Sequence, residues 1–435
     1  MTTPDPSPVS PWRGPAVISA GLVVLGVASY AFLTVAARVL SPVEYAELAA
    51  FWSLVFAVLA GTFFPFELEG TRVASAARVA GRSVQPPLRR LARIAAAVAG
   101  VLLLVIVLGR QALANALFSG DETYVALLAV MTVTFAVIYL GRGALAGTGR
   151  FLTYSVILSG EGLVRVLLLV VVAAAAIASG AAAAAAMAGA SVLAALATVA
   201  LVGRPSGPAA TSPVGMSDDE RRAPANLGAL LVASLAAQGL INAGPLTAQA
   251  LGDDAVQTGA ILAVFVLVRV PVMFITAIQS GFIPALVTTI EGGDIRQFNH
   301  VVSRVLARVA VVGTVIVIGA AVFGPLATRL LFGPRYELQP LDYAVLTASS
   351  VAFMVAALLQ AVLVSLQRHR SVAIAWLAGV VAYAGALVLP LPLLRVVEIG
   401  AILSMGTVCV VMWGTIHIAR PAASHRAVET PAGER

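Results

Sequence analysis

Long apolar segments, each close to the length of a membrane-spanning helix, recur along almost the whole chain. They lie near 15–38, 44–66, 91–117, 122–147, 151–178, 180–203, 225–250, 256–284, 301–323, 342–366, 371–392 and 396–419. Because 60% of the residues are hydrophobic and only 11% are charged, a water-soluble fold is excluded. The sequence therefore predicts an all-α polytopic membrane protein with about 12 transmembrane helices.

The loops between these segments predict domains and orientation. Arginines concentrate in alternate loops, whereas pairs such as Asp121 with Glu122 fall in the others, so both termini are expected on the cytoplasmic side of a bacterial plasma membrane. The net charge of +7 comes from these loops and not from a basic domain, so no nucleic-acid partner is expected. The expected divisions are a disordered tail (1–14), a six-helix lobe (15–203), a cytoplasmic linker rich in Pro, Ser and Gly (204–224), a second six-helix lobe (225–420) and a disordered tail (421–435).

An internal echo supports the two lobes. LANALFSG from Leu113 and LATRLLFG from Leu326 match at four of eight positions, and each lies between two long apolar segments. Internal repeats of this kind are typical of secondary transporters. The echo falls at the bend between the third and fourth helices of each lobe, where a role in the scaffold is expected and not a role in a binding site.

Charged residues inside the apolar segments are the first site candidates, since charge in hydrocarbon is costly unless it is paired or faces water. Glu161 and Arg165 are four residues apart and share one helix face. Two interpretations stay open: a structural ion pair or part of a polar cavity wall. Arg269 precedes Pro271, which should bend the helix, and no carboxylate lies within one turn. It is expected to face a water-filled cavity or an anion, the alternative being a partner on another helix such as Glu161.

A polar stripe marks the seventh segment. Gln238, Asn242 and Gln249 share one helix face, and Gly244-Pro245 should interrupt the helix between them. This pattern predicts a discontinuous helix lining a substrate path. Amide side chains that hold helices together would give the same stripe.

Arg142 comes late in the fourth segment and is expected to snorkel to the cytoplasmic face, with a cavity role as the alternative. Glu67 is near a segment end and is expected at the interface. The sequence contains no phosphate-binding glycine loop, nucleophile elbow or HExxH motif, and its histidines are scattered. Neither an enzyme, a cofactor nor a metal site is expected.

The turn RVLSPVEYAELAAFWSLV from Arg38, together with the half-chain repeat and the expected spans, resembles the polysaccharide-exporting branch (O-antigen or teichoic-acid flippase-like) of the multidrug/oligosaccharidyl-lipid/polysaccharide (MOP) flippase superfamily. That branch has a similar L-S-P-x-E-Y-G turn, in which Ala46 replaces the usual glycine here. The resemblance implies two lobes around a central cavity that opens alternately to each side. It also implies a polyprenyl-pyrophosphate-linked glycan as cargo, moved to the outer leaflet, with a polysaccharide polymerase or glycosyltransferases as possible partners beside the membrane lipids.

On this hypothesis Arg269, supported by Arg165 or Arg142, holds the pyrophosphate, while Gln238 and Asn242 bond the sugar hydroxyls. The main alternative is a cation-coupled multidrug antiporter of the same superfamily. Such antiporters bind the coupling ion with membrane carboxylates, often in the first helix, and the absence of acidic residues from the first segment disfavours this alternative. A major-facilitator carrier is disfavoured because its G-x-x-x-D turn is absent after the second segment. A non-transporting scaffold or a glycan polymerase is a further alternative, although no large extracytoplasmic loop is expected.

Overall fold

The computed structural model describes residues 13–202, 218–252, 254–275, 282, 286, 289, 295–366 and 368–428. These residues contain helices and no strand, and eleven of the described helices are long and apolar enough to cross a membrane. A further helix, α14 (His369–Ala386), lies where the segment 371–392 was expected. The predicted all-α polytopic fold is therefore confirmed. Residues 1–12 and 429–435 of the expected tails, residue 203 of the expected first lobe and residues 204–217 of the expected linker lie outside the described residues.

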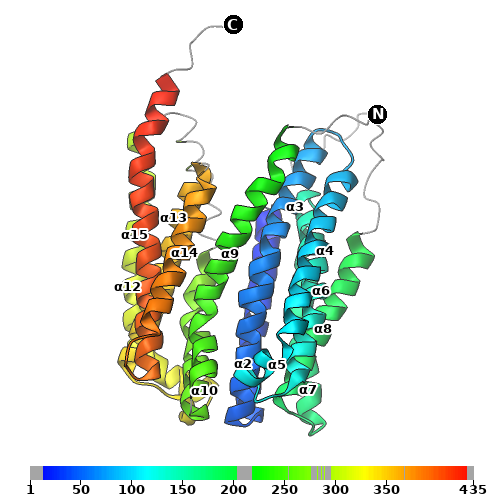
Figure 1. The fold of residues 1–435 in the computed structure, drawn as a ribbon, viewed down its shortest axis with the longest axis vertical. Helices are drawn as coiled ribbons and strands as arrows, with labels where there is room; N and C mark the ends of the chain where they lie inside the picture. Colours follow the sequence, from blue (N-terminus) through cyan, green and yellow to red (C-terminus); the bar gives the residue numbers. More distant parts are fainter. Residues whose placement is uncertain are drawn as a thin grey trace, which may run out of the picture. The chain divides into compact units, whose positions relative to one another are not determined.

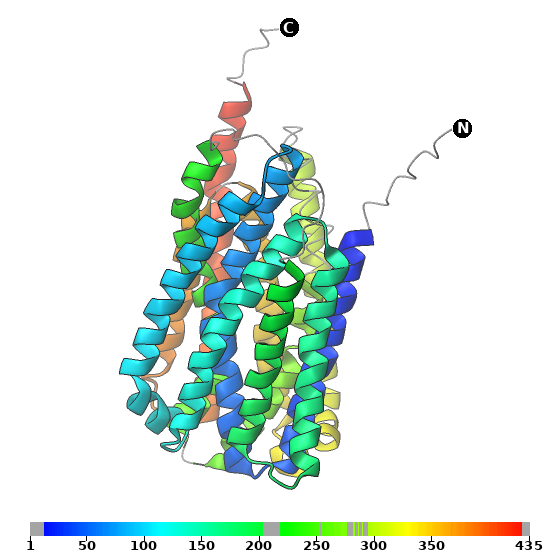
Figure 2. The same cartoon turned by 90° about the vertical axis from the view of Figure 1, so that its right-hand side faces the viewer.

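The first half of the chain runs from α1 to α8 (Figures 1 and 2). Its elements are α1 (Arg13–Val39), α2 (Pro42–Leu54), a π-helical turn η1 (Val55–Ala60), α3 (Gly61–Val79), α4 (Gln85–Leu108), α5 (Arg110–Leu117), α6 (Glu122–Gly147), α7 (Phe151–Ala174) and α8 (Gly180–Val202). Two boundaries differ from expectation. The second span continues through η1 and α3 to Val79, and the segment expected at 91–117 is divided into α4 and α5 at Gly109.

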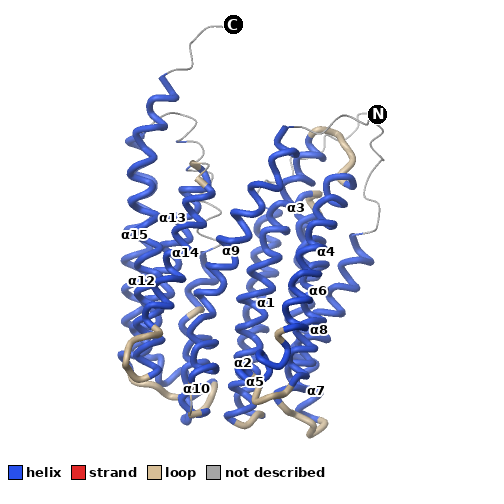
Figure 3. The backbone as a smooth tube through the Cα atoms, in the orientation of Figure 1, coloured by secondary structure: helices blue, strands red, loops and turns tan. Residues whose placement is uncertain are grey.

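The second half contains α9 (Asp218–Leu251), α10 (Ala255–Val268), η2 (Val270–Phe274), α12 (Ile295–Leu331), η3 (Pro334–Tyr336), α13 (Pro340–Ser365), α14 and α15 (Leu393–Val428). Helix α9 begins inside the stretch expected as a linker, and α15 continues into the stretch expected as a tail. The described loops join the ends of the helices (Figure 3).

Contacts between Cα atoms divide the chain into two compact units. The N-terminal unit comprises residues 1–35, 63–110 and 123–223, and the C-terminal unit comprises residues 36–62, 111–122 and 224–435. The C-terminal unit thus includes two stretches from the first half of the sequence. The lobe boundaries expected from sequence, 15–203 and 225–420, remain predictions.

Both copies of the internal echo form helix ends. In the first, the Gly120 amide donates to the Ala114 carbonyl at 3.0 Å, and in the second the Gly333 amide donates to the Thr328 carbonyl at 3.1 Å. Both glycines have positive φ, +89° and +109°, a conformation that closes a helix and favours glycine. The echo therefore repeats a helix-ending signal, which agrees with its expected scaffold role.

The turn that carries the family resemblance starts a helix. Ser41 caps α2: its Oγ accepts from the Glu44 amide at 3.4 Å, while the Glu44 carboxylate accepts from the Ser41 amide at 3.0 Å. Pro42 occupies the first helical position, where its missing N–H costs nothing. Tyr45 is fully buried, and its ring centroid lies 5.4 Å from that of Tyr336. Ser41, Pro42, Glu44 and Tyr45 therefore each have a role in folding.

Candidate functional site

Two ion pairs between a buried carboxylate and a buried guanidinium lie in the N-terminal unit. On α7, Arg165 Nη2 lies 2.8 Å from Glu161 Oε1, and the side chains are 1% and 8% exposed. The expected position of both side chains on one helix face is confirmed, and the two form an ion pair. Whether this pair also lines a substrate path stays a prediction.

The second pair joins different helices. Arg142 of α6 places Nη2 3.0 Å from Glu67 Oε2 of α3 and also donates to the Tyr154 hydroxyl of α7 at 3.0 Å. Tyr154 in turn donates to Glu67 Oε1 at 2.6 Å. Arg142 is therefore buried in a network, and the expectation that it snorkels to the surface is wrong. Glu67 is buried too, because the second span continues past it to Val79 instead of ending at residue 66.

Tyr139 connects the two pairs. The Arg142 guanidinium lies over its ring, 4.8 Å from the centroid. Tyr139 also lies close enough to Glu67, Glu161 and Arg165 for their charges to act on its hydroxyl group. We call the six residues the N-terminal polar cluster; they are Glu67, Tyr139, Arg142, Tyr154, Glu161 and Arg165. In this cluster two carboxylates balance two guanidiniums.

The sequence prediction found three of the six members, Arg142, Glu161 and Arg165. Glu67 was missed because its helix was expected to end one residue earlier. The tyrosines were missed because a tyrosine in an apolar helix carries no signal of its own. Tyr139 does lie three residues before Arg142, on the same helix face, which is a spacing that could have indicated it.

Arg269 and Asn242 meet in the C-terminal unit. Arg269 follows the last residue of α10, and its Nη1 donates to Asn242 Oδ1 at 3.0 Å while Nη2 donates to the Ile241 carbonyl. In an α-helix that carbonyl would accept from the amide of residue 245, but Pro245 has no N–H. The guanidinium thus supplies the missing donor.

The prediction of a break in the seventh span is wrong, and this contact explains why the helix can continue. Helix α9 runs without interruption through Gly244 and Pro245. A Cβ at Gly244 would lie 2.1 Å from the Phe265 ring, so the glycine allows α10 to approach there. Pro271, where a bend was expected, lies in the 3-10 turn η2, which follows the end of α10 at Val268.

Two side chains of the polar stripe, Asn242 and Gln249, donate to backbone carbonyls. Asn242 is 1% exposed, and its Nδ2 donates to the Gln238 carbonyl at 2.8 Å. Gln249 Nε2 donates to the Leu117 carbonyl at 3.1 Å. The Gln249 contact joins α9 to α5, and the bond from Arg269 to Asn242 joins α9 to the end of α10, so these contacts favour the interpretation in which amides hold helices together. A substrate contact for Gln238, Asn242 or Arg269 remains a prediction.

Comparison with solved structures shows which fold this is. The chain is similar to a multidrug resistance MATE family transporter of the MOP superfamily in an inward-facing conformation (TM-score 0.70, 12% identity, 95% of this chain and 96% of that chain). It is also similar to a MOP superfamily transporter from Pyrococcus furiosus (TM-score 0.67, 11% identity, 94% and 96%). A third is the Vibrio cholerae MATE transporter VcmN (TM-score 0.62, 14% identity, 97% of both chains). The chain therefore has the fold of MOP superfamily transporters.

Similar sequences include two proteins of Mycobacterium tuberculosis. "Uncharacterized protein Rv1510" is 27% identical over 370 residues, which are 84% of this chain and 82% of that protein. "Uncharacterized protein Rv3630" is 26% identical over 378 residues, which are 85% and 84%. No family model matches the chain. The fold agrees with the superfamily to which the sequence resemblance pointed, whereas the structural neighbours named above give no support to its polysaccharide-exporting branch.

Proposed function

We propose that the protein is a cation-coupled exporter of small molecules that works by alternating access. It would lie in the bacterial plasma membrane with both termini cytoplasmic. The observation that carries the proposal is the N-terminal polar cluster, which holds Glu67 and Glu161 buried within spanning helices. The fold supports it, because two of the similar structures are MATE transporters, one of them described as a multidrug resistance transporter.

The geometry gives Glu67 a coupling role. Its carboxylate, on α3, binds Arg142 of α6 and Tyr154 of α7, so one charged group joins three helices. A proton or another cation on Glu67 would cancel the charge that attracts the guanidinium. Because an unpaired guanidinium at this depth is costly, the three helices would have to change their contacts. Binding of the coupling ion is thereby linked to helix rearrangement.

A lipid-linked glycan flippase is the second candidate, with a polyprenyl-pyrophosphate glycan as cargo. The turn at Leu40–Tyr45 favours it, since it resembles that branch. Two observations weigh against it. The residues of the turn serve helix capping and core packing. In addition, the guanidiniums of Arg142 and Arg165 are neutralised by carboxylates and do not form a cationic cavity.

The test is transport by protein reconstituted in liposomes. With an imposed pH or sodium gradient, we expect wild-type protein to move a cationic dye. Glu67→Gln should lower the coupled rate by about tenfold or more, because the uptake of one cation is lost. Glu69→Gln is the matched control: it is a buried glutamate on the same helix, but its partner is the half-exposed Arg72.

Two results would contradict the antiporter proposal. One is a gradient-independent rate, and the other is equal loss in Glu67→Gln and Glu69→Gln. If no dye moves while a fluorescent polyprenyl-pyrophosphate glycan changes leaflet, the second candidate is the better description. Glu161→Gln should be measured both in the dye-transport assay and in the glycan assay. The activity that it lowers is the one that depends on the pair of Glu161 and Arg165.

A further inference from the structure

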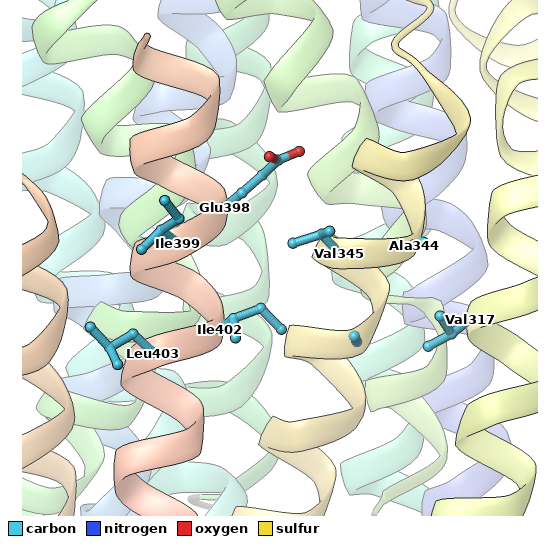
Figure 4. A pocket seen from close by; sticks show the side chains of 8 residues that line it. Val317, Ala344, Val345, Glu398, Ile399, Ile402 and Leu403 are labelled. Carbon is cyan, nitrogen blue, oxygen red and sulfur yellow. The ribbon is translucent and has the colours of Figure 1, made fainter. Parts of the chain in front are cut away.

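We infer that the C-terminal unit carries a binding site for a zwitterionic phospholipid with a primary ammonium headgroup. The site is a groove of about 640 Å³ between α12, α13 and α15 (Figure 4). Its walls are apolar except at one end, where the Glu398 carboxylate of α15 points towards α13. The apolar lining includes Val317 of α12, Val345 and Ala348 of α13, and Ile402 and Leu403 of α15.

The polar end of the groove has unequal charges. Arg395 Nη1 lies 3.0 Å from Asp342 Oδ1 and 2.5 Å from Glu398 Oε2, so two carboxylates share one guanidinium. The Gln339 amide donates to Asp342 Oδ2 at 2.9 Å. Glu398 is 3% exposed, and among the described residues no donor reaches its buried Oε1. A buried carboxylate oxygen without a donor is costly unless it is protonated or meets a cation.

The position of Asp342, Arg395 and Glu398 fits a lipid headgroup. Asp342 is the third residue of α13, and Arg395 and Glu398 are the third and sixth residues of α15. At 1.5 Å per residue, all three lie within about 10 Å of the ends of their helices, near the level where headgroups meet hydrocarbon. The candidate membrane spans of both helices begin two to five residues before these positions, at Pro340 and Leu393.

The groove itself lies on an outward apolar surface. Ile402 and Leu403 of α15 are more than a third exposed, and α12 presents Val315 and Ile318 in the same way. A spanning helix that exposes large aliphatic side chains does so to lipid. An acyl chain can therefore enter this groove from the bilayer.

A lipid with both charges matches the site better than one with a single charge. Its ammonium would pair with the Glu398 carboxylate at the end of the groove, and its phosphate would reach Arg395, whose side chain is 38% exposed. An anionic lipid would meet the excess carboxylate, and a simple amine would leave the exposed guanidinium without an anion. The site shares no residue with the N-terminal polar cluster, so it does not depend on the proposed transport activity.

The test uses the full-length protein purified in a mild detergent, with native mass spectrometry and thermal unfolding as readouts. We expect phosphatidylethanolamine to be retained about tenfold better than phosphatidylglycerol or phosphatidylcholine, the latter because its ammonium has no N–H to donate. Glu398→Gln should abolish the preference. Glu337→Gln, which removes an acid from the exposed pair with Arg329, should keep it.

A second variant covers the case in which Glu398→Gln does not fold. Ala348→Phe fills the groove and leaves all three charges in place, and it should release the lipid. The proposal is overturned by equal retention of phosphatidylethanolamine and phosphatidylglycerol, by an unchanged preference in Glu398→Gln, or by undiminished retention in Ala348→Phe. It is also overturned if dodecylamine displaces the lipid at an equal concentration, since the site would then recognise the amine alone.

Discussion

Replacing Arg269 with methionine separates a structural from a substrate-binding role for this arginine. The guanidinium donates to the Ile241 carbonyl, which lacks a helical donor because residue 245 is proline. The substitution Pro245→Ala would give that carbonyl its ordinary partner, the amide of residue 245. Arg269→Met should therefore be much less harmful in the Pro245→Ala background than in the wild type.

The magnitude follows from the two bonds. An acceptor left unsatisfied in the protein interior costs about 1–3 kcal/mol, and loss of the bond to Asn242 adds about 1 kcal/mol. Arg269→Met should thus cost about 2–4 kcal/mol of unfolding free energy in the wild type. In the Pro245→Ala background only the term for Asn242 remains, about 1 kcal/mol. The four variants form a double-mutant cycle. Replacing Pro245 changes the free energy of the unfolded chain equally whether residue 269 is arginine or methionine, so this contribution cancels in the coupling free energy.

The assay is a denaturant titration of the four variants in detergent micelles, followed by helical signal, with transport measured in parallel. The predicted coupling free energy is about 1–3 kcal/mol. Equal destabilisation by Arg269→Met in both backgrounds would refute the idea that the guanidinium serves the carbonyl freed by Pro245. If Arg269 also binds cargo, export should fall equally in both backgrounds even where stability is restored.

Three further predictions concern packing and capping. Arg165→Met should cost about 3–5 kcal/mol by leaving Glu161 charged and buried, whereas the double variant with Glu161→Leu should be close to neutral in the same titration. Gly244→Ala should lower the thermal unfolding midpoint by several degrees, since its Cβ would overlap the Phe265 ring. Ser41→Ala should cost about 1 kcal/mol through loss of a helix cap and leave the rate of transport per folded molecule unchanged.

The sequence predicted contacts that lie within one helix better than contacts between helices. Glu161 and Arg165 are four residues apart, and helix geometry alone places them on one face. The partner of Arg142 is 75 residues away in the chain, at a position set by how α3 packs on α6. Hydropathy ended the second span at residue 66 and so placed Glu67 at the interface, whereas the helix continues because its polar side chains find buried partners.

The seventh span shows the same limit for the backbone. Glycine followed by proline predicts a helix break when neighbouring elements are ignored. Here the guanidinium of Arg269, directly after α10, replaces the donor that Pro245 removes. The ring of Phe265, in α10, fills the space beside Gly244. Both compensations belong to tertiary structure, so no local pattern could indicate them.

The two most recognisable motifs of the sequence therefore carry information about fold and little about cargo. The echo at Leu113 and Leu326 closes helices with glycines of positive φ, and the turn at Ser41 opens a helix with a capping box. Such signals persist wherever the same helices must begin and end, whatever the function of the protein. A resemblance built on them can point to the right fold, as the structural comparison shows, without distinguishing the branches of the superfamily. Cargo and coupling have to be inferred from the buried charges, which the motifs do not contain.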